Sequence, residues 1–234
     1  LDFYLAPAES AAPLLVFIQG SGCGSAFGVE EDGSVFSTLA QERIVQMVDD
    51  RFSVLVVDKV GVEPGAFPDD GGEMAFCSET TRANHTLDTW AARLGDAIDQ
   101  AKSLAPVDQN RPISLLGFSE GAVASARVAA LRQDVGHVTF ISGFGCGLFD
   151  DLVTLAQREW RANHPDVSAE ERQAGNTAAA AAILGQVETV LATPDAMTPL
   201  FEGHTPKYWS SVGYACPAED LARSNAEVFV AVGM

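Results

Sequence analysis

Short apolar runs alternate with helical segments along most of the chain, and this alternation limits the possible folds more than any other feature. The runs are six or seven residues long and comprise residues 13–19, 53–58, 112–117, 137–142 and 227–232, while residues 1–7 resemble the end of another strand. Strands separated by helices predict an α/β fold with a mostly parallel central sheet and helices on both faces. Because such a sheet is covered on both sides, we expect the five runs to be buried, central strands.

The segments between the runs have the composition and spacing of helices. Apolar residues recur at three- and four-residue steps in residues 37–49 and 87–104, and residues 120–132 are rich in alanine and valine. These three segments are therefore expected to cover the sheet.

From about residue 143 to residue 216 the alternation stops. Two helices are expected in this stretch, at residues 150–163 and 168–191, and Ser168 and Glu171 have the spacing of a capping box at the start of the second. A helical block between two core strands predicts a cap. We therefore predict an α/β core formed by residues 1–142 and 217–234, with a helical cap inserted at residues 143–216.

The charge of the chain excludes several classes of partner. The formal net charge is −18, and lysine occurs only as Lys59, Lys102 and Lys207. Such a surface repels nucleic acids and anionic lipid surfaces, so neither is an expected partner. No apolar run reaches the roughly 18 residues that a membrane span requires. The oligomeric state is not indicated by the sequence.

Four cysteines, Cys23, Cys77, Cys146 and Cys216, all fall in predicted loops. They form no C-x-x-C pair and have no histidine at metal-like spacing, so no zinc site is expected. Disulfides Cys23–Cys77 and Cys146–Cys216 would each stabilise the fold by about 4 kcal/mol, although connectivity is not fixed by spacing and four unpaired thiols are the alternative. Disulfides would indicate a periplasmic or secreted protein. The chain begins without a signal sequence, so we expect a removed leader or a shortened chain.

The stretch Gly117-Phe-Ser-Glu-Gly121 fits the pattern G-x-S-x-G and carries the strongest indication of chemistry. It follows a predicted buried strand and opens a predicted helix, which is the setting of a nucleophile turn. The positive end of the helix dipole would favour a developing alkoxide on Ser119. The alternative is a serine that only caps the helix. We predict that Ser119 is a catalytic nucleophile.

A second glycine-rich stretch, Gln19-Gly-Ser-Gly-Cys-Gly24, directly follows the first strong strand. Acyl transfer requires hydrogen-bond donors for the oxyanion, and glycine-rich backbone exposes such N–H groups. The expected donors are the N–H of Ser21 or Gly22 together with that of Glu120. A phosphate-binding loop is disfavoured because no lysine follows the glycines, whereas a plain flexible turn remains the alternative.

These motifs, in this order, resemble the α/β-hydrolase superfamily, and in particular bacterial secreted or periplasmic serine esterases and peptidases. The resemblance covers nearly the whole chain and is most specific at GFSEG. It implies that Ser119 is the nucleophile and that the oxyanion is bound around Ser21 or Gly22 and Glu120. Gln19 stands where many members have histidine, which changes the support of the loop but not its N–H groups.

The resemblance also implies an acid and a histidine that follow the serine in the chain. The acid usually follows the strand that VFVAVGM resembles, so both residues are expected beyond Met234. His204 is the best alternative within the chain, and with Tyr208 and Trp209 it is expected to line a pocket under the cap. His85 precedes the serine, and His137 is expected at the opposite end of the sheet.

We therefore predict a serine hydrolase that cleaves a carboxylic ester, or an amide, through an acyl-enzyme on Ser119. No metal or organic cofactor is implied. A peptidase acting on small peptides is one alternative. A non-catalytic protein that binds a ligand on a hydrolase scaffold is the alternative from a different class.

Overall fold

The computed structural model describes residues 3–29, 32, 35–37, 39–66, 77–104, 106–200 and 203–232. The chain divides into two compact units. The first comprises Leu1–Gly143 and Pro217–Met234, and the second comprises Phe144–Cys216. The second unit occupies the part of the sequence for which a cap was predicted; its role as a cap stays a prediction.

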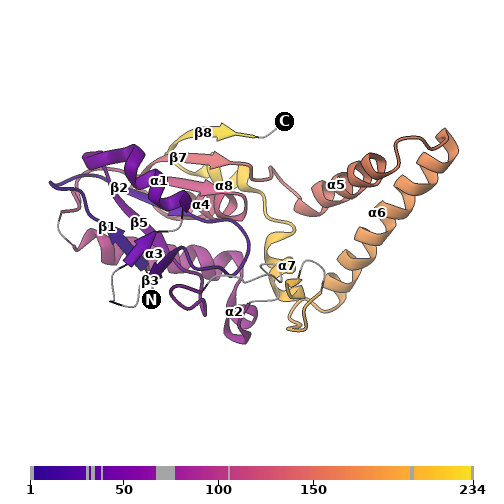
Figure 1. Cartoon of the computed structure of the whole chain (residues 1–234), viewed down its shortest axis with the longest axis horizontal. Helices are drawn as coiled ribbons and strands as arrows, with labels where there is room; N and C mark the ends of the chain where they lie inside the picture. The colour runs from indigo at the N-terminus through magenta and orange to yellow at the C-terminus, as the bar shows by residue number, and fades with distance from the viewer. Residues whose placement is uncertain are drawn as a thin grey trace. The chain divides into compact units, whose positions relative to one another are not determined.

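A six-stranded sheet in the order β1-β5-β2-β6-β7-β8 forms the centre of the first unit (Figure 1). β1 runs antiparallel to β5, and the other neighbouring strands run parallel. The predicted fold class is therefore confirmed. The five predicted runs and the strand expected in residues 1–7 agree with the observed strands to within two residues; the six strands are β1 (Phe3–Ala6), β2 (Leu14–Ile18), β5 (Ser53–Val57), β6 (Ile113–Phe118), β7 (Val135–Ile141) and β8 (Glu227–Ala231).

The long helices of the first unit form where apolar residues recur at helical spacing. α3 (Leu87–Lys102) and α4 (Glu120–Leu131) pack on one another and on the sheet, and α1 (Leu39–Val48) continues into the short 3-10 helix η1 (Asp49–Arg51). The buried face of α3 includes the residues expected from its periodicity, namely Leu87, Trp90, Leu94, Ile98 and Ala101.

Several short elements were not predicted. They are the antiparallel pair β3 (Phe27–Val29) and β4 (Val35–Ser37), and the helices α2 (Glu79–Asn84), α7 (Pro206–Val212) and α8 (Pro217–Arg223). None is longer than seven residues, so none contains enough turns or alternations to show a period in the sequence.

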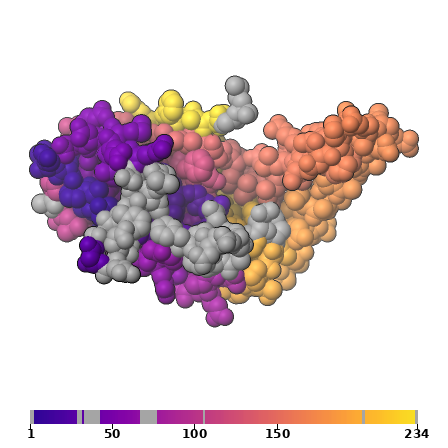
Figure 2. Space-filling model, viewed as in Figure 1, coloured from indigo at the N-terminus to yellow at the C-terminus, as the bar shows by residue number. Residues whose placement is uncertain are grey.

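The expectation that the last apolar run is a buried, central strand was wrong. Within the described sheet β8 is an edge strand with β7 as its neighbour, and it lies at the surface in Figure 2. Val228, Phe229 and Val230 are 40%, 65% and 55% exposed, whereas every residue of β5 is buried. An apolar composition shows that a strand can be buried on both faces, but it does not determine the strand's place in the sheet.

The second unit is built on a helical hairpin. α5 (Leu148–Asn163) and α6 (Ala169–Ala192) lie side by side, and α7 (Pro206–Val212) packs on α6. The capping box predicted at the start of α6 is present, because the Glu171 N–H donates to Ser168 Oγ and the Ser168 N–H donates to Glu171 Oε2. The buried core of this unit comprises Phe149, Val187, Val190, Tyr208, Trp209 and Val212.

Each unit contains one disulfide. Cys23 is bonded to Cys77 in the first unit, and Cys146 is bonded to Cys216 across the two ends of the second. None of the described helices is long and apolar enough to cross a membrane. In the same described residues, no three or more His, Cys, Asp or Glu side chains are grouped so that they could hold a metal ion.

Two glycines of α6 provide a matched test of the hairpin packing. A Cβ atom at Gly175 would lie 2.0 Å from Cζ2 of Trp160 on α5, whereas a Cβ atom at Gly185 would meet no atom within 4 Å. We expect Gly175→Ala to lower the free energy of unfolding by about 1–3 kcal/mol, because the tryptophan must move. Gly185→Ala should raise it by up to about 1 kcal/mol through helix propensity. Urea unfolding of both variants tests the packing, and equal stability would contradict it.

Candidate active site

Ser119 lies in a strained turn between β6 and α4. Its backbone angles are φ 54° and ψ −121°, a region that residues other than glycine rarely occupy. Such a conformation costs about 1–3 kcal/mol and persists only where the surrounding structure enforces it. The Ser119 N–H donates to the Ile141 carbonyl of β7 at 2.9 Å, and the side chain does not cap the helix. The helix-capping alternative is therefore not the role of this serine.

The two glycines of the motif are required by close contacts. A Cβ atom at Gly121 would lie 2.1 Å from the Ile18 carbonyl oxygen, and one at Gly117 would lie 2.4 Å from the Gly121 carbonyl oxygen. The first turn of α4 therefore contacts the carboxyl ends of β2 and β6 at a distance that leaves no space for a side chain. This contact forces the chain through the sharp turn at Ser119.

The glycine-rich loop that follows β2 passes beside the same serine. A Cβ atom at Gly20 would lie 3.1 Å from Cβ of Ser119. Ser21 is exposed, and Gly22 is buried with φ 104°, in the region that favours glycine. Two of the predicted oxyanion residues thus belong to a loop next to the predicted nucleophile. The third, Glu120, is the residue that follows it.

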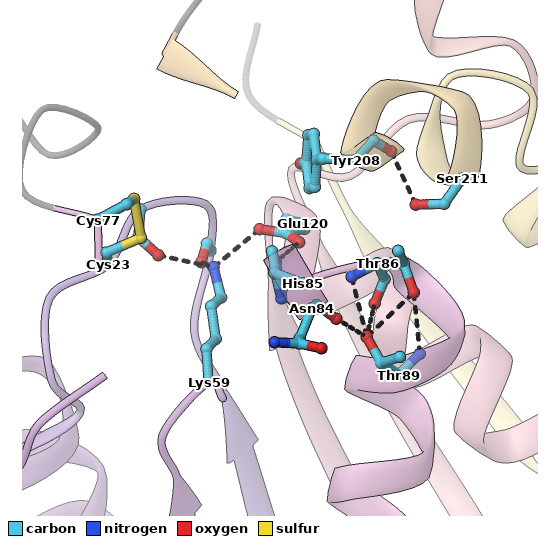
Figure 3. A network of polar contacts seen from close by, with 12 residues as sticks. Cys23, Lys59, Cys77, Asn84, His85, Thr86, Thr89, Glu120, Tyr208 and Ser211 are labelled. Carbon is cyan, nitrogen blue, oxygen red and sulfur yellow. Dashed lines mark hydrogen bonds and ion pairs between the residues drawn. A yellow bond between two sulfur atoms is a disulfide. The ribbon is translucent and has the colours of Figure 1, made fainter. Parts of the chain in front are cut away.

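A buried network of charges lies behind this loop (Figure 3). Lys59 Nζ donates to Glu120 Oε2 at 2.8 Å, to the Gly20 carbonyl at 2.7 Å and to the Gly22 carbonyl at 3.0 Å. His85 Nε2 lies 2.7 Å from the other carboxylate oxygen, Glu120 Oε1. The side chains of Lys59, Glu120 and His85 are 0%, 5% and 5% exposed.

Sequence reasoning missed this network, because it gave the Glu120 side chain little weight and considered Lys59 only for its contribution to the net charge. A signal was nevertheless present. Lys59 is one of three lysines in a strongly acidic chain and comes two residues after the apolar run that forms β5, with Asp58 between them. A lysine this close to the end of a buried strand can itself be buried, and lysine is almost never fully buried unless its charge is paired.

The network determines the charge state of Glu120. Burial alone would raise the pKa of this carboxyl group, but the nearby Lys59 ammonium and the His85 ring outweigh the burial and hold the pKa well below its ordinary value of 4.5. Glu120 is therefore an anion at neutral pH. It is held by two partners and is not available as a proton acceptor for Ser119.

The histidines of the first unit do not contact Ser119. His85 hydrogen-bonds Glu120, and His137 pairs with Ser114 at the end of β6 opposite Ser119. The Ser119 side chain makes no capping hydrogen bond to α4. Neither histidine of the first unit is thus placed as the base of the predicted nucleophile.

The predicted pocket residues of the second unit form an aromatic cluster. The His204 ring stacks on Tyr208 with centroids 3.7 Å apart and contacts Trp209 edge-on at 5.6 Å. All three side chains are buried, and Tyr208 and Trp209 belong to the hydrophobic core of this unit. His164, at the end of α5, is exposed and stacks on Trp160. A pocket role for His204, Tyr208 and Trp209 stays a prediction.

The Cys23–Cys77 disulfide connects the glycine-rich loop to the segment that carries His85. Cys23 directly follows Gly22, and Cys77 precedes α2, whose C-terminal end is capped by His85. The loop after β2 is therefore fixed at two places, by the disulfide and by Lys59.

The lowered pKa of Glu120 predicts a pH-dependent stability. A carboxyl group with a lowered pKa in the folded state stabilises the fold above its ordinary pKa, and this contribution is lost as the pH falls below it. We expect Glu120→Gln to be less stable than the unmodified protein at pH 7. The difference should shrink between about pH 5 and pH 3, by at most about 1.4 kcal/mol for each pH unit.

Urea unfolding at a series of pH values measures this difference. Glu188→Gln, at an exposed position of α6, is the control and should follow the unmodified protein at each pH. A stability difference for Glu120→Gln that stays constant from pH 7 to pH 3 would contradict the buried ion pair.

Comparison with known proteins gives similarity in structure alone. No protein-family model and no curated protein sequence matches the chain. Among solved structures, proline iminopeptidase from Mycobacterium smegmatis is similar with a TM-score of 0.52 and 16% identity, over 97% of this chain and 76% of that one.

Two further structures are more distant. A bacterial membrane phospholipase A has a TM-score of 0.48 and 17% identity over 99% of this chain, and DcsB has a TM-score of 0.44 and 16% identity over 70% of it. The chain spans only 65% of the phospholipase and 48% of DcsB. The fold of the iminopeptidase is that of the hydrolase superfamily which the motifs resemble. The chain therefore has the α/β-hydrolase fold.

Proposed function

We propose that this chain is a serine hydrolase that cleaves a carboxylic ester through an acyl-enzyme on Ser119. The strained backbone of Ser119, at φ 54° and ψ −121° between β6 and α4, carries the proposal. A turn of this kind exposes a hydroxyl group at the carboxyl edge of the sheet, where α/β-hydrolases hold their nucleophile. The adjacent loop at Gly20–Gly22 supports the same function.

In the proposed reaction, Ser119 Oγ attacks the carbonyl carbon of the ester while its proton passes to a base. The oxyanion accepts hydrogen bonds from the N–H of Ser21 or Gly22 and from that of Glu120. Collapse of the tetrahedral intermediate breaks the bond to the alcohol oxygen, and the alcohol leaves with the proton. Water then attacks the acyl-enzyme by the same steps and releases the acid.

The histidines of the first unit do not supply the base in this proposal. His85 is bound to Glu120, and His137 lies at the other end of β6. We propose that the proton passes to a histidine oriented by an acid, both beyond Met234 as the family resemblance implies, with His204 as the alternative base within the chain. Without such a base, an oxyanion site and binding alone retain only about 10³–10⁴-fold acceleration over water.

Replacement of the nucleophile tests the proposal. Ser119→Ala should abolish turnover of short p-nitrophenyl esters and labelling by a fluorophosphonate probe, because both reactions require the serine oxygen. Ser125→Ala is the matched control, since Ser125 is buried on the same helix and donates to the Ala122 carbonyl. Turnover and mass spectrometry of the labelled protein provide the two readouts.

The outcome separates the proposal from its alternatives. Ester turnover that survives Ser119→Ala would refute the serine mechanism. A folded protein that neither turns over esters nor reacts with the probe would favour a non-catalytic binding protein. Hydrolysis of short peptides but not of esters would assign an amide substrate to the same serine.

We also propose that the protein functions in the periplasm or outside the cell. The two disulfides, Cys23–Cys77 and Cys146–Cys216, support this location because such bonds persist in oxidising compartments.

Alkylation under denaturing conditions tests the disulfides. Without reductant, protein isolated with thiols blocked at lysis should gain no alkyl groups, and after reduction it should gain one at each of the four cysteines. Intact mass spectrometry reads the number directly. Alkylation of all four cysteines without reductant would remove the support for an exported protein.

A further inference from the structure

Lys59 makes three contacts that use its whole hydrogen-bonding capacity. An ammonium group has three N–H donors, and those of Lys59 bind Glu120 Oε2, the Gly20 carbonyl and the Gly22 carbonyl. The side chain is 0% exposed, so no water competes for these donors. The ammonium group is therefore fixed, and so are the two peptide groups that it binds.

The orientation of these peptide groups follows from their planarity. In a trans peptide the carbonyl of one residue and the N–H of the next residue point in opposite directions. Because the Gly20 carbonyl points to Lys59, the Ser21 N–H points away from Lys59, and the Cys23 N–H is oriented in the same way by the Gly22 carbonyl. Of the two loop residues considered as oxyanion donors, Ser21 is thus the one whose N–H is fixed by a described contact.

The third contact joins this loop to the other half of the oxyanion site. Glu120, whose side chain binds Lys59, also provides the second proposed N–H donor at the start of α4. One buried ion pair therefore links the two backbone segments that would bind the oxyanion. His85 holds the second oxygen of Glu120 and so restricts the carboxylate further.

Asp58, the residue before Lys59, binds a different part of the same loop. Its carboxylate accepts hydrogen bonds from Ser25 Oγ at 2.6 Å and from the Ala26 N–H. Asp58 thus fixes the end of the loop farther from Ser119, whereas Lys59 fixes the peptides on either side of Ser21 and Gly22.

We propose that Lys59 is a positioning residue for catalysis, which orients the Ser21 N–H and holds it in place relative to the Glu120 N–H. This inference rests on the proposed function, because it assigns Lys59 to the oxyanion site of the Ser119 hydrolase. Lys59 itself contacts no reacting atom; it acts through the backbone of the loop.

The test uses a double variant, because Lys59→Met alone would leave the Glu120 carboxylate buried without its cation and could prevent folding. Lys59→Met combined with Glu120→Gln removes both charges and the anchor of the two carbonyls. Glu120→Gln alone keeps that anchor and is the reference. Lys102→Met is the control for loss of a lysine, since Lys102 binds Asp134 on a partly exposed surface.

We expect kcat for p-nitrophenyl acetate to fall about 10²-fold from Glu120→Gln to the double variant, the typical effect of one oxyanion donor. KM should change less than about threefold, because the donor acts mainly in the transition state. Lys102→Met should keep the unmodified kcat and KM. A folded double variant with the kcat of Glu120→Gln would overturn the proposal, as would a fall in kcat/KM caused by KM alone.

A second measurement does not depend on turnover. Backbone ¹⁵N relaxation should show the Ser21 amide as rigid in Glu120→Gln, with an order parameter of about 0.85. In the double variant the same amide should be flexible, with an order parameter below about 0.6. Equal order parameters would overturn the positioning role. If the unmodified protein has no Ser119-dependent activity, the proposed function fails, and these order parameters alone decide whether Lys59 holds the loop.

Discussion

The close contact between the first turn of α4 and the ends of β2 and β6 is the constraint on which the candidate site depends. A Cβ atom at residue 121 would lie 2.1 Å from the Ile18 carbonyl oxygen. The helix can therefore start at this point only if residue 121 is glycine. The contact sets the strained turn at Ser119 and brings the loop after β2 beside it. Parallel strands gather these segments at one edge of the sheet, since the carboxyl ends of β2, β5 and β6 all lie there.

Much of this architecture could be predicted from the sequence. Continuous apolar runs between helical segments identified the parallel strands, and G-x-S-x-G after such a run identified the turn at Ser119. The Lys59–Glu120–His85 network could not be predicted, because its members come from three separate segments and no local period connects them. The position of β8 at the edge of the described sheet also could not be predicted, because strand order depends on how the connections cross the sheet rather than on composition.

The buried network also illustrates how an acidic protein uses a scarce cation. The chain has three lysines and a net charge of −18, yet one lysine is wholly buried next to the predicted nucleophile. A buried ammonium group requires compensation by an anion and by carbonyl dipoles, and Lys59 has both. The two carbonyls that Lys59 binds are thereby held in fixed orientations, which an apolar side chain at this position could not achieve.

The disulfide at the base of the second unit has a consequence for how this protein could have diversified. Cys146 and Cys216 are 70 residues apart in sequence, but their Cα atoms are 4.0 Å apart. The intervening helical segment therefore leaves and rejoins the rest of the chain at almost one point. A segment with such adjacent ends can be exchanged for another, or for a tight turn, without altering the distance that the flanking chain must bridge.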